Sequence, residues 1–239
     1  MGRGDIPPLR SLPRLFLPGA TADGPIDLPK EEVDKFRKVL RLSEGDPIAV
    51  LPNDGSLIRC EFRNRQAVPH SVEWPNTEPD LKVTLAQALP KSDRIDTVVR
   101  MGTEIGVSAF CFFAGERSVV RWDESKTRDR LRRLEAIARE SAEQSFRSVL
   151  PTIEFVKDLK AVLGRWPEAI VLSEVEGLNK GLQRERSAVT IVIGPEGGWA
   201  PRELTLIGER GVTLGPRVLR TDTAGPAAAA VLLLSNDGA

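Results

Sequence analysis

Two loops in the last third of the chain carry the residue types best suited to chemistry. In the first, the apolar run 191–193 ends abruptly in Gly-Pro-Glu-Gly-Gly at positions 194–198, and glycines allow a ligand to approach the backbone closely. The second loop, residues 214–224, carries Arg217, Arg220 and Asp222. Guanidinium groups beside a carboxylate can stabilise charge that develops during a reaction. The two loops are therefore the candidate site, although the first alone is equally well explained as an ordinary strand-to-helix turn.

The sequence around these loops predicts strands that alternate with helices. The predicted strands are Val83–Leu89, Val107–Phe113, Ala169–Ser173, Val189–Ile193 and Val212–Leu214. The predicted helices are Asp93–Glu104, Thr127–Arg147, Pro201–Arg210 and Thr223–Ser235. Such alternation is typical of a parallel α/β sheet covered on both faces. Because ligands of these sheets bind outside the carboxyl ends of the strands, this fold would bring the two loops to one crevice.

The first part of the chain has a different pattern, with short strands around one helix. Arg14–Leu17 predicts a strand, and residues 48–51 and 57–62 predict a hairpin around an Asp-Gly turn. A helical period in Lys30–Arg41 places four apolar residues on one face, namely Val33, Phe36, Val39 and Leu40. These elements predict a small β-rich barrel.

The domain boundary is expected in Gln66–Asp80. This stretch contains three prolines among polar residues, which is typical of a linker. We therefore expect a first domain in residues 1–75 and a second in residues 80–239.

The charges of the chain balance, with 34 Lys and Arg residues against 34 Asp and Glu residues. This balance gives no reason to expect a polyanionic partner, so any contact with nucleic acid must come from local patches. The candidates for phosphate contacts are Arg14, Arg117, Arg128 and Arg132, with an ordinary solvated surface as the alternative.

The amino-acid composition argues against several kinds of catalytic and metal site. His70 is the only histidine, so a His-based metal cluster and a Ser-His-Asp arrangement are nearly excluded, and we expect no metal. Cys60 and Cys111 lie far apart in apolar segments, which predicts packed thiols in a reducing compartment. The chain has no run of about 18 apolar residues that would span a membrane. We expect a soluble, cytoplasmic protein.

Taken together, several motifs resemble the signature of a known family. They are the loops GPEGG (194–198) and LGPRVLRTDTA (214–224), with KSDR (91–94), TEIGV (103–107), ERS (116–118) and AEQS (142–145) upstream. They are similar to those of the RsmE-type 16S ribosomal RNA uridine-N3 methyltransferases of the SPOUT superfamily, which use S-adenosylmethionine. The resemblance covers most of the chain after about residue 80. It implies a SPOUT-type parallel sheet with a C-terminal trefoil knot, a preceding PUA-like RNA-binding domain, and a homodimer.

The chain departs from this family in three places. The family usually has Glu where Asp222 stands and commonly has Phe where Trp199 stands. It often has a His pair near Glu32–Lys35, where this chain has none. The shorter Asp222 keeps the charge of the family's Glu but reduces its reach.

The resemblance also implies which residues bind the cofactor. In the family, the adenosine lies in a pocket built from three loops, which match residues 172–174, 194–198 and 214–219 here. The implied cofactor-binding residues are Leu172, Ser173, Gly194, Pro195, Glu196, Gly197, Gly198, Leu214, Gly215, Arg217 and Leu219.

The acceptor side of the reaction needs a cation and an acid. The N3 atom of uracil must lose a proton as it attacks, and negative charge then spreads onto the flanking carbonyl oxygens. Arg220 is the first candidate to stabilise that charge, and Arg217 is the second. Glu196 and Asp222 are candidates for the proton acceptor, and Asp222 has a helix cap as an equal alternative role. The expected partner is 16S ribosomal RNA or the small ribosomal subunit.

Three other functions compete with this interpretation. A SPOUT ribose 2′-O-methyltransferase would carry an Asn-bearing motif in the last loop, where this chain has residues 219–224 instead. A non-catalytic RNA-binding ribosome-assembly factor would keep the fold without transferring a methyl group. A dinucleotide-binding dehydrogenase is disfavoured, because Gly-Pro-Glu-Gly-Gly lacks the Gly-x-Gly-x-x-Gly spacing.

Overall fold

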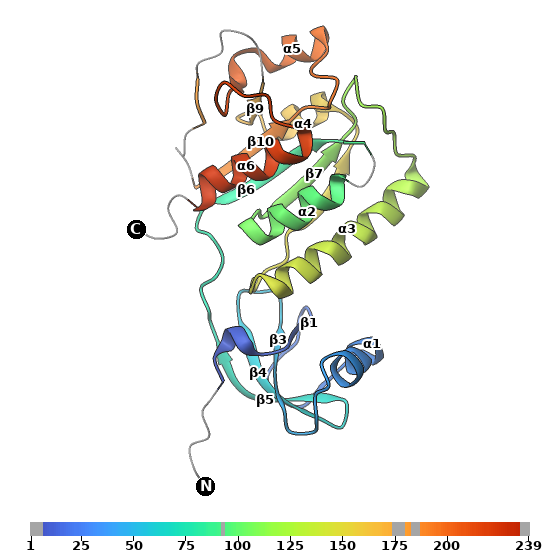
Figure 1. Cartoon of the computed structure of the whole chain (residues 1–239), viewed down its shortest axis with the longest axis vertical. Coiled ribbons are helices and arrows are strands. Elements are labelled where there is room, and N and C mark those ends of the chain that lie inside the picture. The colour runs from blue at the N-terminus through green and yellow to red at the C-terminus, as the bar shows by residue number, and fades with distance from the viewer. Residues whose placement is uncertain (1–6, 92–93, 174–179, 183–186, 235–239) are drawn as a thin grey trace. The chain divides into compact units, whose positions relative to one another are not determined.

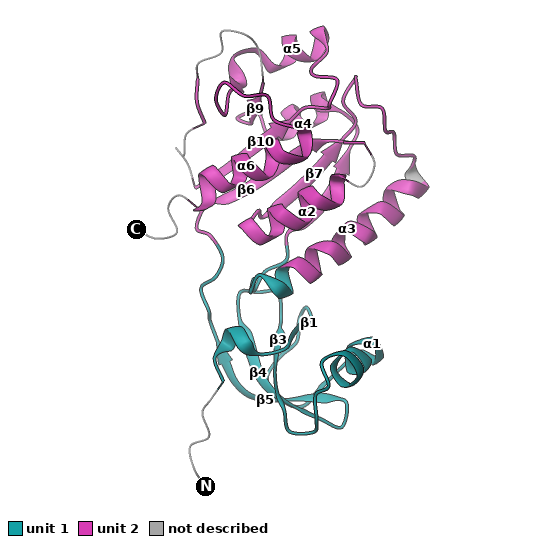
Figure 2. Ribbon diagram, in the orientation of Figure 1, with its two compact units in different colours: residues 1–78, 142–150 teal, residues 79–141, 151–239 magenta. Residues whose placement is uncertain are grey.

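A computed structural model describes residues 7–91, 94–173, 180–182 and 187–234 (Figure 1). The chain forms two compact units, which Figure 2 colours separately. Unit 1 contains residues 1–78 and 142–150, and unit 2 contains residues 79–141 and 151–239. The sequence does not predict the return of the chain to unit 1 at residues 142–150.

Unit 1 is built around a five-stranded mixed sheet with the order β1-β3-β4-β5-β2. β1 runs parallel to β3, and the other pairs are antiparallel. The strands are β1 (Arg14–Phe16), β2 (Ile26–Asp27), β3 (Pro47–Leu51), β4 (Leu57–Arg63) and β5 (Gln66–Glu73). In the core, Phe36 packs edge-on against Phe62, with ring centroids 5.8 Å apart. The predicted first strand and the predicted hairpin are both confirmed.

Strand β5 shows that the predicted linker is wrong over most of its length. β5 pairs with β4 from Gln66 to Glu73. Pro69 is accommodated because the register between the two strands shifts at Arg59 and Cys60, and a residue without an N–H donor fits at such an irregularity. Pro69 therefore marks a bulge in a strand, which composition alone cannot distinguish from a linker.

The predicted helix at Lys30–Arg41 is shorter and changes type. α1 spans Lys30–Asp34, and a π-helical turn follows at Lys35–Val39. Val33 and Phe36 are buried as predicted, whereas Val39 is 71% exposed and Leu40 is 44% exposed. A π-helical turn contains more residues than an α-helical turn, so the later apolar side chains rotate away from the core.

Two carboxylates hold residues 142–150 in unit 1. Glu143 accepts a hydrogen bond from the backbone N–H of Phe16 at 3.2 Å. Glu78 accepts hydrogen bonds from the guanidinium of Arg147 at 2.6 Å and from the two backbone N–H groups that follow it. The Arg147 side chain is only 5% exposed, so its charge depends on Glu78 for compensation.

Unit 2 contains a six-stranded sheet with the order β11-β9-β10-β6-β7-β8, in which every pair is parallel. The strands are β6 (Lys82–Ala88), β7 (Ala109–Phe113), β8 (Thr152–Val156), β9 (Ile170–Leu172), β10 (Ala188–Ile193) and β11 (Gly211–Val212). This confirms the predicted parallel α/β sheet. The sequence missed β8, because this edge strand has no fully buried residue and hence no strong apolar signal.

Helices cover both faces of this sheet, as predicted. Leu85, Phe110 and Ile191 pack in the core beneath α2, α3 and α6, whereas Cys111 and Val192 pack beneath α4 and α5. In Figure 1, α2 and α6 lie in front of the strands. The helices are α2 (Arg94–Ile105), α3 (Glu124–Gln144), α4 (Leu159–Arg165), α5 (Pro201–Ile207) and α6 (Thr221–Leu233), of which α4 is not predicted by the sequence.

The two cysteines are buried and unpaired, as predicted. Burial raises the pKa of the Cys60 thiol and of the Cys111 thiol to about 12.

In the part of the chain that the structure describes, no helix is long and apolar enough to cross a membrane. Within the same residues, no group of three or more His, Cys, Asp or Glu side chains comes together as a metal ion would require.

Candidate functional site

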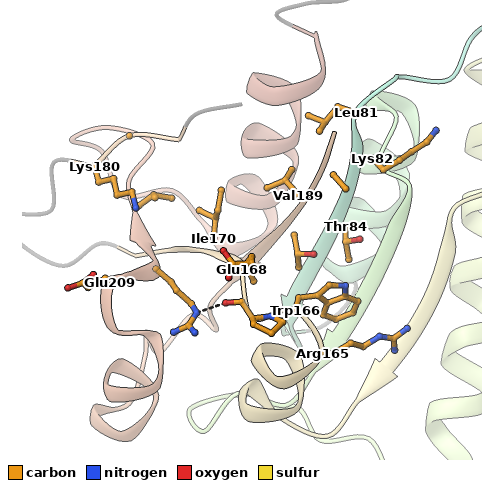
Figure 3. Close-up of a pocket in the computed structure, with 17 residues that line it drawn as sticks. Leu81, Lys82, Thr84, Arg165, Trp166, Glu168, Ile170, Lys180, Val189 and Glu209 are labelled. Atoms are coloured by element: carbon orange, nitrogen blue, oxygen red, sulfur yellow. Dashed lines mark hydrogen bonds between the residues drawn. The ribbon is translucent and has the colours of Figure 1, made fainter. Parts of the chain in front are cut away.

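Two cavities open at opposite ends of the unit 2 strands. The larger, of about 770 Å³, lies at the amino ends of β6, β9 and β10. Figure 3 shows it between Lys180, Ile170, Trp166 and Thr84. Neither of the two predicted loops reaches it. Because ligands of parallel α/β sheets bind at the carboxyl ends of the strands, its greater size does not make it the candidate site.

The second cavity, of about 470 Å³, lies at the carboxyl ends of β9, β10 and β11. Its volume is within the range typical of small-molecule sites. Both predicted loops contribute to its wall. The predicted residues that line it are Leu172, Ser173, Gly194, Pro195, Glu196, Gly198, Leu214, Arg217, Leu219 and Arg220.

Three other predicted residues do not line this cavity. A Cβ added to Gly197 would lie 3.1 Å from Cβ of Arg117, so this glycine faces that arginine. Gly215 has a φ of 116°, and its role is to allow the turn. Asp222 lies instead beside Arg94. Glu174, Ser92 and Asp93, which belong to the quoted motifs, lie outside the described residues.

Arg94, at the start of α2, lines the cavity and was given no role by the sequence. Its Nη1 lies 3.6 Å from Oε1 of Glu196 and 3.9 Å from Oδ1 of Asp222. The backbone N–H of Lys91 also donates to Oε1 of Glu196 at 2.9 Å. One guanidinium thus lies between two carboxylates. The signal that pointed to Arg94 was its place in the motif KSDR, whose last two residues begin the predicted helix Asp93–Glu104.

Asp222 is not the helix cap that its sequence position suggested. Arg220 occupies the N-cap position of α6, and Asp222 is the second residue of the helix. Within the described chain, Oδ1 of Asp222 is buried and has no hydrogen-bond partner. A buried carboxylate oxygen without a donor costs stability. The cation beside it is Nη1 of Arg94, 3.9 Å away, which compensates part of its charge without a hydrogen bond.

Trp199 connects the loops that follow β9 and β10. Its indole N–H donates to the carbonyl of Leu172 at 3.1 Å, and its ring stacks on Phe113 with centroids 6.5 Å apart. A Cβ at Gly194 would lie 2.9 Å from the indole ring. Gly194 is therefore required by the packing of Trp199, whether or not a ligand also needs it. The sequence singled out Trp199 only as a departure from the family pattern.

Among the arginines predicted to contact phosphates, Arg14 is already engaged within unit 1. Its guanidinium lies 4.5 Å from the ring centroid of Phe146 and donates to the carbonyls of Leu12 and Arg10. Burial lowers the pKa of Arg14, although the nearby Glu143 opposes this change. These contacts give Arg14 a structural role and leave it few donors for a phosphate.

The other three arginines are exposed. Arg128 and Arg132 lie on α3, where Arg132 makes a surface ion pair of 3.6 Å with Asp129. Arg117 lies in the loop after β7 and donates to the carbonyl of Gly197 at 3.1 Å. Arg128 and Arg132 are therefore accessible to a polyanion, whereas Arg117 already contacts the loop of the cavity.

The lining of the cavity limits what it can hold. Leu172, Leu214 and Leu219 offer apolar surface, while Glu196 and Arg217 provide opposite charges. Such a lining suits a ligand that combines a flat apolar ring with charged groups.

Known proteins resemble this chain in sequence. The sequence model of a family described as an RNA methyltransferase domain matches residues 77–233. The ribosomal RNA small subunit methyltransferase E of Bacillus subtilis is 36% identical over 219 residues, covering 81% of this chain and 84% of that protein.

Solved structures extend the comparison to the fold. A ribosomal RNA small subunit methyltransferase E from Neisseria gonorrhoeae, bound to S-adenosyl methionine, is 28% identical, covers 92% of this chain and 96% of its own, and has a TM-score of 0.82. A methyltransferase from Legionella pneumophila, in complex with the same cofactor, is 26% identical, covers 94% of this chain and 98% of its own, and has a TM-score of 0.85.

Proposed function

Because this chain belongs to the RNA methyltransferase family, we propose that it transfers a methyl group from S-adenosylmethionine to the N3 atom of a uridine in 16S ribosomal RNA. The observation that carries this proposal is the cavity at the carboxyl ends of β9, β10 and β11. It gathers most of the residues expected to bind the cofactor, together with Arg220.

The residues of this cavity fit S-adenosylmethionine. Leu172, Leu214 and Leu219 would contact the adenine ring. Gly198 has a φ of 68° and open space where a Cβ would lie, so the backbone can approach the ligand closely there. Glu196 would face the positive charge of the ligand. When bound, the cofactor supplies a methyl group carried on a positively charged sulfur.

Arg220 and Asp222 would act on the uridine. Arg220 lines the cavity and stabilises the negative charge that spreads over the uracil as N3 loses its proton. Asp222 would receive that proton through the exposed part of its carboxylate, since its side chain is 23% exposed, whereas Oε1 of Glu196 already accepts the N–H of Lys91. Arg94 holds the two carboxylates in place.

Contacts with RNA would come from local basic patches, since the net charge of the chain is zero. Arg128 and Arg132 on the exposed side of α3 would contact phosphates. The mixed sheet of unit 1 would serve as a PUA-like RNA-binding domain, which its five short strands around Phe36 and Phe62 support.

We also propose a C-terminal trefoil knot and a homodimer. The order of the strands supports the knot, because the chain passes from β10 to the edge strand β11 before α6 returns to pack against β6, β10 and α2. The exposed side chains of Val231 on α6 and of Leu234 directly after it support the dimer, since a second copy would remove this apolar surface from water. Light scattering at micromolar concentration tests the homodimer, and the mass of a monomer would contradict this proposal.

The proposed function is tested by methylation of purified small ribosomal subunits and of naked 16S ribosomal RNA, with the product mapped by mass spectrometry. We expect N3-methyluridine at a single position, and no product from Arg220→Ala in the same time. A methyl group on a ribose oxygen would instead indicate a 2′-O-methyltransferase. Binding of the cofactor without transfer to either substrate would indicate a non-catalytic assembly factor.

A further inference from the structure

The turn at residues 115–118 lies directly against the cofactor loop, residues 194–200. Each segment contains a turn closed by a backbone hydrogen bond, from Ser118 to Gly115 at 3.0 Å and from Gly198 to Pro195 at 2.9 Å. A Cβ added to Gly115 would lie 3.1 Å from Cγ of Pro195. The two turns therefore pack closely, and a side chain at Gly115 would push against Pro195.

Arg117 makes the first polar connection between these turns. Its Nη1 donates to the carbonyl of Gly197 at 3.1 Å. A Cβ at Gly197 would lie 3.1 Å from Cβ of Arg117 and 3.4 Å from its carbonyl oxygen. Arg117 thus occupies the side of Gly197 on which a side chain would stand.

Glu203 makes the second connection. This side chain belongs to the first turn of α5, and the residue is only 6% exposed. One carboxylate oxygen accepts the N–H of Glu116 at 2.9 Å, and the other accepts the N–H of Ala200 at 2.9 Å. A single buried carboxylate therefore fixes both the 115–118 turn and the end of the cofactor loop.

We propose that Arg117 is a positioning residue for S-adenosylmethionine and not a contact for RNA phosphate. The inference rests on the proposed function, because it assumes that the cofactor lies in the cavity of about 470 Å³. Arg117 does not line that cavity, so it acts through Gly197 on neighbours that do, such as Gly198 and Glu196. This gives a role to the motif ERS at 116–118, which the chemistry of the site leaves unused.

The test measures two affinities of Arg117→Ala. Calorimetry without RNA should show that cofactor affinity falls about three- to tenfold, as expected for one lost hydrogen bond. RNA affinity and its dependence on salt should match those of the unchanged protein. Arg117→Lys should recover part of the cofactor affinity. Arg100→Ala is the matched control, since it removes an exposed arginine of unit 2 that does not line the cavity and should leave cofactor affinity unchanged.

Two further variants keep the test decisive if Arg117→Ala is unstable. Gly197→Ala adds a Cβ that would lie 3.1 Å from Cβ of Arg117 and would displace that side chain. Glu203→Gln keeps the shape of the side chain but replaces one accepting oxygen of the carboxylate with an N–H donor. Both should weaken cofactor binding while thermal unfolding shows a folded protein.

The opposite pattern would overturn the proposal. In that case Arg117→Ala would bind the cofactor normally but would bind RNA more weakly, with the salt slope reduced by about one. Failure of the proposed function would look different, because the unchanged protein would then bind the cofactor without methylating RNA, and the effect of Arg117→Ala on cofactor affinity would still be measurable.

Discussion

The indole N–H of Trp199 donates to the carbonyl of Leu172, and the same ring occupies the space where a Cβ of Gly194 would lie. One side chain therefore sets the separation of the loops that follow β9 and β10. Those loops form two of the walls of the candidate site.

This relationship predicts non-additive effects. Trp199→Phe keeps an aromatic ring but loses the hydrogen bond, so cofactor affinity should fall about three- to tenfold. Gly194→Ala should be more harmful in the natural background, because its Cβ meets the indole. The smaller ring of Trp199→Phe should relieve that clash, so the double variant should bind better than the sum of the single effects predicts. Calorimetry of the four proteins checks this, and simple additivity would contradict it.

Arg220→Ala should lower turnover much more than cofactor affinity, because the guanidinium acts on charge that develops in the transition state. The loss in rate should be on the order of 100- to 1000-fold. Arg220→Lys should recover only part of it, since lysine restores the charge without the planar fork. Single-turnover methylation at saturating RNA is the measurement. If Arg220 only held a phosphate, saturation would restore a near-normal rate.

Asp222→Asn should abolish most of the turnover, whereas Glu196→Gln should mainly weaken cofactor binding. The difference follows from the bond that Lys91 donates to Glu196, which leaves the partly exposed carboxylate of Asp222 as the proposed proton acceptor. Because Asp222 is not the helix cap, Asp222→Asn should cost no more than about 1 kcal/mol of stability. Turnover, cofactor affinity and thermal unfolding are measured for both variants. Equal turnover of the two variants would contradict the assignment of the proton acceptor to Asp222 alone.

Glu78→Gln should destabilise unit 1 strongly. It leaves the buried guanidinium of Arg147 without its compensating charge, which typically costs about 3–5 kcal/mol. Arg132→Ala breaks an exposed ion pair with Asp129 and should cost less than about 1 kcal/mol. Denaturant unfolding of both variants gives the comparison. Equal losses would show that the Glu78 pair is not important for stability.

The two buried thiols predict a loss of stability at high pH. Burial raises the pKa of Cys60 and Cys111 from 9.0 to about 12, so the folded state holds these protons more tightly than the unfolded state. Their contribution is complete below about pH 9 and is lost as the pH rises from there towards 12. Denaturant unfolding across that range checks the slope, which Cys60→Ala with Cys111→Ala should reduce. Neither thiol should react with an alkylating reagent near neutral pH.

The candidate loops could be found from the sequence because their signals are local. The glycines of 194–198 directly follow an apolar run, and Arg220 directly precedes a helix, so a short window contains each signal. The pairing of Arg94 with Glu196 joins residues about a hundred positions apart, and no local pattern reports it. The same applies to the contact between Arg117 and Gly197, from which we propose a positioning role for this arginine.

The errors in the fold predicted from the sequence have a similar origin. Strand β5 was hidden because Pro69 marks a linker by composition, and only pairing with β4 makes it a bulge. Val39 and Leu40 were placed in the core because a period of 3.6 residues was assumed through a turn that is π-helical. Sequence patterns thus predicted the layers and the candidate loops, whereas partners distant in sequence decided the details.

The return of residues 142–150 to unit 1 has a consequence for synthesis and for dissection of the protein. The chain passes between the two units three times, at residues 78–79, 141–142 and 150–151. Unit 1 therefore cannot be completed on the ribosome until residues 79–141 of unit 2 have been translated and residue 150 has emerged. A fragment cut at residue 78 would lack Arg147. The carboxylate of Glu78, its last residue, would then have lost its ion-pair partner. A usable isolated unit 1 would need residues 142–150 joined back to it by an artificial connection.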